Sequence, residues 1–304
     1  MKKAVIDIGT NSVRLYAADV ERGRQQLIQK ALKTTRLGEG IGRGNSIQRE
    51  PMARTVCAVG DFVQTARSLG AADKDIYIYA TAMVREAENQ EEFCRQVHAQ
   101  CGIFPEVISG ETEAEIAYLG AAAGYPEAGV LDIGGGSTEV VTKFSGQLSV
   151  LSQKIGAVRL KEKFSPYAQE GVVDTAPIKK YLSESFLPGY EDTGIRRATR
   201  LIGVSGTPTT LASLHLGYRT YHPQEIQGFV LQKTEMDRQL ELLAEMTQPQ
   251  RESYMGEFAD RADIIVYGGC ILSAFMEYYG FDALTVSDRD SLEGYLEYKL
   301  RILA

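Results

Sequence analysis

The sequence predicts a mixed α/β protein built from two similar lobes. Its 304 residues exceed what one hydrophobic core commonly fills, which favours two compact units. Strand-like apolar runs alternate with segments of helical spacing, as is typical of mixed α/β folds. One strand-turn-strand pattern occurs twice, at the start and near the middle of the chain. We therefore expect lobes at residues 1–125 and 126–304, with the last helix, about 291–304, packing back on the first lobe.

The first lobe is expected to open with three antiparallel strands. Residues 4–8 form a β-branched and aliphatic run, and extended character resumes at 13–18 and again at 26–35. The remaining elements expected in this lobe are helices at 51–69, 89–101 and 109 to about 124, and strands at 76–79 and 106–108.

The second lobe is expected to begin in the same way, after the break at Gly124-Tyr125-Pro126. Strands are predicted at 130–133, 138–144 and 147–154. The apolar run at 201–204 leads through a glycine turn into a helix, with Pro208 in its first turn. Further helices are predicted at 233–246, 262–279 and 291–303.

The repeat itself is specific. Aligning residues 5–12 with 130–137 pairs Asp7 with Asp132, Gly9 with Gly134 and Ser12 with Ser137. A period of about half the chain indicates two similar lobes rather than a solenoid. We expect the two Asp-x-Gly hairpins to face each other across a cleft.

Glycine turns of this kind suit phosphate chemistry. Glycine lets backbone N–H groups approach phosphoryl oxygens, hydroxyl groups add donors, and a carboxylate can hold a hydrated cation. A single Asp-Ile-Gly-Thr turn indicates no more than a β-turn with an Asx hydrogen bond. Two related turns, with a third at residues 203–207, favour a phosphate-binding cleft.

Composition limits the partners. A formal net charge of −7 argues against a nucleic-acid binder with a broad basic surface, so a polyanionic substrate must be met by local cationic side chains, N–H groups and a metal ion. The four cysteines show neither Cys-x-x-Cys spacing nor a disulfide-scaffold pattern. Lysines interrupt the apolar start, so neither a signal peptide nor a membrane span fits, and we expect a cytoplasmic protein with no membrane partner.

Several segments, in their order along the chain, resemble the exopolyphosphatase / guanosine pentaphosphate phosphohydrolase family. They are residues 4–15 (AVIDIGTNSVRL), 80–89 (ATAMVREAEN), 107–110 (VISG) with Glu113-Ala114, 132–139 (DIGGGSTE), 156–160 (GAVRL), Gly206-Thr207 and 261–265 (RADII). The resemblance covers nearly the whole chain. It implies a fold of the actin, sugar kinase and Hsp70 type, with two ribonuclease H-like lobes and the active site in the cleft between them.

The resemblance also implies roles for the acidic residues. Glu113 matches the catalytic glutamate that activates water, and Glu139 joins it as a catalytic residue. Asp132 and Glu139 match carboxylates that organise Mg²⁺ (or Mn²⁺) and the attacking water, and Asp7 matches the acidic residue of the first phosphate loop. Without the resemblance, Glu113 reads equally well as a helix-start residue that complements the dipole, as Glu111 does.

The predicted phosphate-binding set combines the three loops with two arginines. Its members are Gly9, Thr10, Asn11, Ser12, Arg14, Arg85, Gly134, Gly135, Gly136, Ser137, Thr138, Gly206 and Thr207. Arg159 could extend a basic track, whereas Lys161 and Lys163 read as ordinary surface. The chain departs from the family pattern at residues 291–294, where Leu292 stands in place of an arginine and Arg289 is a nearby substitute.

The function predicted on this basis is exopolyphosphatase activity, the hydrolysis of the terminal phosphoryl group of inorganic polyphosphate by an activated water. Guanosine pentaphosphate hydrolysis stays open as an alternative substrate reading. A small-molecule kinase of the same superfold, with a nucleotide pocket near Gly206-Thr207 and Gly268-Gly269, and a catalytically silent phosphate or nucleotide sensor are the alternatives from other classes. A homodimer is left open as the assembly state.

Overall fold

The computed structural model describes residues 1–40, 45–122, 125, 127–165 and 171–302. The chain divides into two compact units, Met1–Gly120 with Ser291–Ala304, and Ala121–Asp290. We call them unit 1 and unit 2. Two residues of the predicted break, Gly124 and Pro126, lie outside the described residues.

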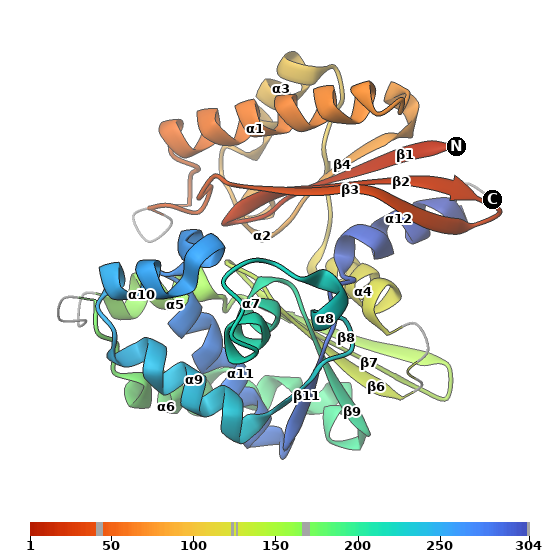
Figure 1. Ribbon diagram of the computed structural model, residues 1–304. Helices are drawn as coiled ribbons and strands as arrows, with labels where there is room; N and C mark the ends of the chain where they lie inside the picture. The colour runs from red at the N-terminus through yellow and green to blue at the C-terminus, as the bar shows by residue number, and fades with distance from the viewer. Residues whose placement is uncertain (41–44, 123–124, 126, 166–170, 303–304) are drawn as a thin grey trace. The chain divides into compact units, whose positions relative to one another are not determined.

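Unit 1 is a five-stranded sheet with helices on both faces, in the order β3-β2-β1-β4-β5 (Figure 1). Its strands are β1 (Lys2–Ile8), β2 (Ser12–Glu21), β3 (Arg24–Thr34), β4 (Ile76–Ala80) and β5 (Glu106–Val107). Its helices are α1 (Arg49–Ser68), the 3-10 turn η2 (Asp73–Asp75), α2 (Ala82–Arg85), α3 (Gln90–Cys101), α4 (Gly110–Ala121) and α12 (Ser291–Ile302).

Strand alternation explains why β1 is apolar almost throughout. Ala4, Ile6 and Ile8 pack in the core cluster that includes α1 and α3. Val5 points to the other face, where it packs with residues of α4 and α12. Asp7 shares the face of Val5, so the sheet turns this carboxylate toward the α12 side.

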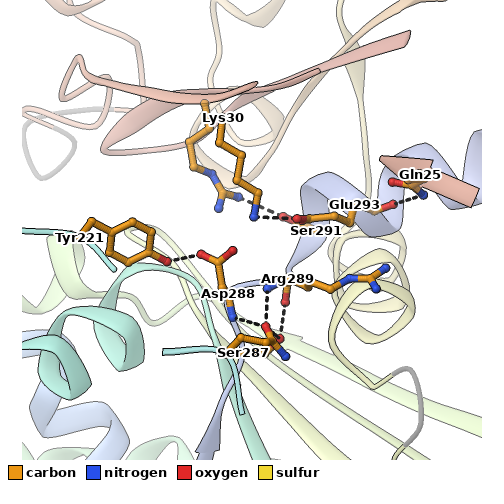
Figure 2. Close-up of polar contacts among 10 residues, drawn as sticks. Gln25, Lys30, Tyr221, Ser287, Asp288, Arg289, Ser291 and Glu293 are labelled. Atoms are coloured by element: carbon orange, nitrogen blue, oxygen red, sulfur yellow. Dashed lines mark hydrogen bonds and ion pairs between the residues drawn. The ribbon is translucent and has the colours of Figure 1, made fainter. Parts of the chain in front are cut away.

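The last helix completes unit 1. Leu292, which occupies the position where the family pattern has arginine, is a 3% exposed core residue beside Tyr295 and Leu296. Figure 2 shows Glu293 at the start of this helix paired with Lys30 of β3 at 2.6 Å, and Gln25 donating to the Glu293 carbonyl.

Gly294 explains how closely α12 approaches α4. A Cβ atom on Gly294 would lie 1.7 Å from the Ile116 carbonyl oxygen, a main-chain atom that cannot rotate away. Gly60, within α1, would place its Cβ 2.8 Å from the amide end of Gln100, which is a flexible side chain. Two glycines in helix interiors therefore differ in what surrounds them.

We expect Gly294→Ala to destabilise the protein by about 1–3 kcal/mol or more, because the backbone of α12 must move. Gly60→Ala should be neutral or stabilising by up to about 1 kcal/mol, because alanine is the better helix former. Thermal unfolding of both variants checks this. Equal shifts in Tm would show that the Gly294 contact does not hold the helix.

Unit 2 contains a six-stranded sheet in the order β10-β11-β9-β6-β7-β8. Its strands are β6 (Ala128–Ile133), β7 (Thr138–Phe144), β8 (Gln147–Gln153), β9 (Arg200–Val204), β10 (Val230–Gln232) and β11 (Ala283–Val286). Its α-helices are α5 (Ala157–Phe164), α6 (Thr175–Ser185), α7 (Gly206–His215), α8 (Pro223–Ile226), α9 (Lys233–Glu245), α10 (Gln248–Met255) and α11 (Ile265–Tyr279). Its 3-10 helices are η4 (Leu187–Thr193), η5 (Ile195–Arg197) and η6 (Gly256–Arg261).

The two sheets share one topology, which confirms the prediction of two similar lobes. In each sheet, three antiparallel strands are followed by two strands that extend the first one in parallel: β1 to β5 correspond to β6, β7, β8, β9 and β11. Unit 2 adds the antiparallel edge strand β10. The predicted mixed α/β class and its internal repeat are therefore both present.

One predicted helix boundary is wrong. The helix expected from Ala262 begins only at Ile265. The carbonyl of Ala262 accepts a hydrogen bond from the buried Arg251 side chain at 2.9 Å, which holds this segment as a turn after η6. No helix within the described ranges is both long enough and apolar enough to cross a bilayer.

Candidate phosphate and metal site

In unit 1, the predicted residues gather at the carboxyl ends of three parallel neighbours. β1, β4 and β5 run side by side, with Ile8 opposite Ala80 and Ala80 opposite Val107. The first phosphate loop follows β1, Arg85 follows β4 and Glu113 follows β5. Carboxyl ends of parallel strands are where open α/β sheets commonly bind ligands.

In unit 2, the same edge carries the second and third loops. β6 and β9 are parallel, with Asp132 opposite Val204. The loop at residues 134–137 follows β6, and Ser205-Gly206-Thr207 follows β9 and begins α7. The repeat thus places equivalent loops at equivalent strand ends.

The two Asp-x-Gly hairpins are closed by the same hydrogen bond. In unit 1 the N–H of Gly9 donates to the Ser12 carbonyl at 3.0 Å. In unit 2 the N–H of Gly134 donates to the Ser137 carbonyl, also at 3.0 Å. The sequence alignment of these turns is therefore also a structural alignment.

The second loop is fastened from behind by the start of α5. Three of its carbonyl groups accept hydrogen bonds there: Gly134 from Ala157 N–H (3.0 Å), Gly135 from Val158 N–H (2.9 Å) and Gly136 from Arg159 Nε–H (2.7 Å). In a trans peptide the N–H points away from the C=O. The N–H groups of residues 135, 136 and 137 are therefore turned to the other side of the loop, in the arrangement that binds anions.

The first loop is fastened in the same manner by the segment after β3. The Thr10 carbonyl accepts from Gly38 N–H at 2.9 Å, and the Asn11 carbonyl accepts from Thr35 N–H at 3.0 Å. The same peptide geometry turns the N–H groups of Asn11 and Ser12 away from this segment. Both loops present donors because their carbonyl groups are already used.

Two glycines that sequence reasoning did not assign to the site make this fastening possible. A Cβ on Gly156 would lie 2.4 Å from the Gly135 carbonyl oxygen, and a Cβ on Gly38 would lie 2.4 Å from Cγ2 of Thr10. Gly156 belonged to a recognised motif, which was the available signal. Gly38 had no comparable signal.

Asp7 and Arg14 lie opposite each other on β1 and β2 and form an ion pair. Nε and Nη2 of Arg14 donate to Oδ2 of Asp7 at 2.9 and 2.5 Å. The predicted metal role of Asp7 and phosphate role of Arg14 thus fall on two residues that bind each other. Both roles stay predictions.

Arg85 and Glu113 are brought together in unit 1. Nη1 of Arg85 donates to Oε2 of Glu113 at 3.1 Å and to the Ile108 carbonyl at 2.9 Å. The Glu113 side chain is 13% exposed. The predicted base is therefore held by a predicted phosphate-binding arginine.

The equivalent row in unit 2 contains two carboxylates. Asp132 lies opposite Glu139, and Glu139 lies opposite Ser152, so the three share one face of the sheet. Asp132 is 6% and Glu139 1% exposed. Ser152, which sequence reasoning missed, donates its hydroxyl to Oε1 of Glu139 at 2.6 Å.

The charge of Glu139 is felt by a neighbouring tyrosine. Burial, and then the nearby Glu139 carboxylate, raise the pKa of Tyr190 well above its usual value. The phenol therefore stays protonated and donates to the Thr138 carbonyl at 2.8 Å. The Thr138 hydroxyl is itself buried and donates to the Ile155 carbonyl at 2.7 Å, so this side chain serves the internal structure of unit 2.

The third loop is tightly built. Ser205 adopts a positive φ of 68°, in the left-handed region that most residues avoid. A Cβ on Gly206 would fall 1.8 Å from Nη1 of Arg261, so the guanidinium lies directly on this glycine. Gly268 of α11 would place a Cβ 2.4 Å from Oγ1 of Thr207. Sequence reasoning noted the motif of Arg261 but gave this residue no role.

The acidic residues suit a hard cation that shares its ligands with a substrate. Among the described residues, no group of three or more His, Cys, Asp or Glu side chains could hold a metal ion. Mg²⁺ is commonly bound by one or two carboxylates together with phosphate oxygens and water. Asp132 and Glu139, buried and side by side, fit that donor set.

A pocket of about 490 Å³ lies elsewhere in unit 2. It is lined at the amino ends of β9 and β11 by residues such as Arg196, Arg200 and Ala283. None of the predicted site residues lines it.

Comparison with known proteins gives a family model that covers most of the chain. Residues 17–301 match the model described as the Ppx/GppA phosphatase family. The chain is also 30% identical over 308 residues to Exopolyphosphatase 2 of Mycobacterium tuberculosis, covering 96% of each chain.

Two further relatives have informative coverage. The chain is 30% identical to a bifunctional 3-dehydroquinate synthase/phosphatase of Fusobacterium nucleatum, covering 96% of this chain but spanning only 46% of that protein. Among solved structures, the Aquifex aeolicus member of the Ppx/GppA family matches with a TM-score of 0.80 and 28% identity, covering 100% of this chain and 98% of that one.

Proposed function

The chain belongs to the Ppx/GppA phosphatase family, and from this premise we propose that it hydrolyses the terminal phosphoanhydride bond of inorganic polyphosphate. The observation that carries the proposal is the pair of loops whose carbonyl groups are fastened from behind, so that both present N–H donors at the carboxyl ends of their strands. Donors of this kind suit the oxygen-rich end of a phosphate chain.

In unit 1, we assign Glu113 as the general base that takes a proton from the attacking water. Arg85, which already contacts the Glu113 carboxylate, is assigned to a phosphoryl oxygen, together with Arg14. The N–H groups of the first loop supply further donors. The water is the nucleophile, and the shortened polyphosphate is the leaving group.

In unit 2, we assign phosphate binding to the second loop and to Gly206-Thr207 at the start of α7. The N-terminus of a helix favours negative charge because its first N–H groups lack intrahelical partners. Turnover is proposed to require both units, since the base lies in unit 1 and the carboxylate row lies in unit 2.

We propose that Asp132 and Glu139 hold Mg²⁺ (or Mn²⁺), with Asp7 as the third acidic residue of the predicted set. When bound, the cation would offset the negative charge on the transferring phosphoryl group and its leaving oxygen. Ser152 keeps Oε1 of Glu139 in place through its 2.6 Å hydrogen bond. A cytoplasmic location and a homodimer stay predictions.

The decisive experiment measures orthophosphate release from polyphosphate of defined length and from guanosine pentaphosphate, each with Mg²⁺, with Mn²⁺ and with EDTA. We expect metal-dependent release from polyphosphate, with chains that shorten from the end. Faster release from guanosine pentaphosphate would move the assignment to that substrate. Label transfer from ATP to an acceptor would indicate a kinase, and tight binding without turnover a sensor.

A further inference from the structure

A row of four polar side chains crosses the unit 1 sheet on the face that α12 covers. Arg14 lies opposite Asp7, Asp7 opposite Tyr79, and Tyr79 opposite Glu106. Directly opposite residues on neighbouring strands point to the same face. The row therefore runs through four strands, from the predicted phosphate-binding arginine to the edge strand β5.

α12 meets this row with three residues spaced four apart, Ser291, Tyr295 and Lys299. Residues at i, i+4 and i+8 lie along one face of a helix. The Tyr295 hydroxyl donates to Glu106 at 2.7 Å, and Lys299 forms an ion pair with the same carboxylate. The Tyr295 ring also stacks on Tyr79, with centroids 4.4 Å apart.

Ser291 is the member of this set that reaches Arg14. Its hydroxyl oxygen accepts from Nη2 of Arg14 at 3.0 Å and from the Tyr79 hydroxyl at 3.1 Å. Ser291 is 4% exposed, so both bonds are shielded from water. Nη2 of Arg14 also donates to Asp7 at 2.5 Å, so the guanidinium is held from two directions.

The rest of α12 does not need this hydroxyl to stay in place. Leu292, Tyr295 and Leu296 bury apolar surface in the unit 1 core. The close contact of Gly294 with the Ile116 carbonyl fixes how the helix sits on α4. A purely structural role therefore predicts that losing the Ser291 hydroxyl affects stability alone.

We propose that Ser291 is a positioning residue that fixes the guanidinium of Arg14 against Asp7, and so sets the orientation in which Arg14 meets the substrate phosphoryl oxygens. This inference rests on the proposed function for its kinetic consequence. Its structural part, the restraint of Arg14 by α12, stands on the contacts within unit 1.

The kinetic test compares Ser291→Ala, Ser291→Thr and Tyr79→Phe with the wild-type protein, using polyphosphate and Mg²⁺. Ser291→Ala should raise KM by about 5- to 10-fold with kcat nearly unchanged, because one hydrogen bond that orients a binding group is lost. Ser291→Thr keeps the hydroxyl and should restore KM. Tyr79→Phe keeps the Arg14 bond and should leave KM near the wild-type value.

The matched control is Ser213→Ala, which removes another fully buried helix hydroxyl, one that donates to the Thr209 carbonyl at 2.8 Å. It should leave KM unchanged. A rise in KM as large with Ser213→Ala or Tyr79→Phe as with Ser291→Ala would reduce the effect to general loosening and overturn the proposal.

A second readout is independent of activity. In ¹⁵N NMR spectra, the Nε–H signal of Arg14, assigned by its loss in Arg14→Lys, should exchange slowly with water in the wild type and at least about tenfold faster in Ser291→Ala, since tenfold corresponds to the loss of one such bond. An unchanged exchange rate in Ser291→Ala would sink the inference. If the wild-type protein releases no phosphate, the proposed function fails while this measurement still decides the role of Ser291.

Discussion

Replacing Glu113 with glutamine is expected to slow phosphate release from polyphosphate by about 100- to 10,000-fold, the range that a positioned general base contributes. Glutamine keeps the size of the side chain and an oxygen that can accept from Arg85, but it cannot take a proton from water. Single-turnover kinetics should show the loss in the chemical step. Calorimetric titration should show substrate binding close to that of the wild type.

Glu111→Gln is the matched control for this variant. Glu111 lies in the first turn of the same helix and is exposed. Hydrogen bonds to its own backbone N–H and to Ser109 lower the pKa of its carboxyl group, as expected for a residue that caps a helix start. Its variant should retain a near-normal rate. A similar loss in both variants would point to a helix-start effect, and a near-normal rate for Glu113→Gln would remove this residue from the mechanism.

Asp132→Asn is expected to abolish metal-stimulated turnover, with a loss of at least about 100-fold at saturating polyphosphate, because the pair of carboxylates proposed to hold the cation would be broken. A second readout does not need turnover. In the wild type, Mg²⁺ at about 100 times its Kd should stabilise the fold by about 2.7 kcal/mol and raise Tm. That metal-dependent rise should vanish in Asp132→Asn and in Glu139→Gln.

The control for the metal variants is Asp237→Asn. Asp237 lies in α9 of the same unit, where it accepts from Lys233 and Ser273 at 2.6 Å. Its variant should keep both the activity and the rise of Tm with Mg²⁺. If Asp132→Asn keeps that rise, the cation is bound elsewhere, and the assignment of the β6 and β7 carboxylates fails.

Local patterns were sufficient to predict the fold class. The strand at Thr138–Phe144 has the predicted bounds, and the repeated opening is present as two sheets of one topology. Period-2 and period-3.6 patterns depend on neighbouring residues, so they can be read from the chain. The same reasoning missed α5 and α10, which are eight residues each.

The contacts of the site were less accessible to prediction, because they join residues far apart in sequence. Arg14 and Ser291 are 277 positions apart, and no periodicity connects them. Leu292 was noted only as a missing arginine, whereas the structure makes it a core residue. The pairing of Asp7 with Arg14 required knowing the register of β1 and β2, which the sequence of a single hairpin does not determine.

The discontinuity of unit 1 has a consequence for synthesis on the ribosome. Unit 2 is one continuous stretch and can assemble its core as soon as residue 290 has emerged, whereas unit 1 still lacks the helix that covers Val5 and Tyr79. A nascent chain therefore carries an uncovered apolar sheet face until translation is nearly complete. Arg14 gains its Ser291 partner only among the last steps of maturation, so a chain released early would retain unit 2 with its carboxylate row but not a finished arginine site.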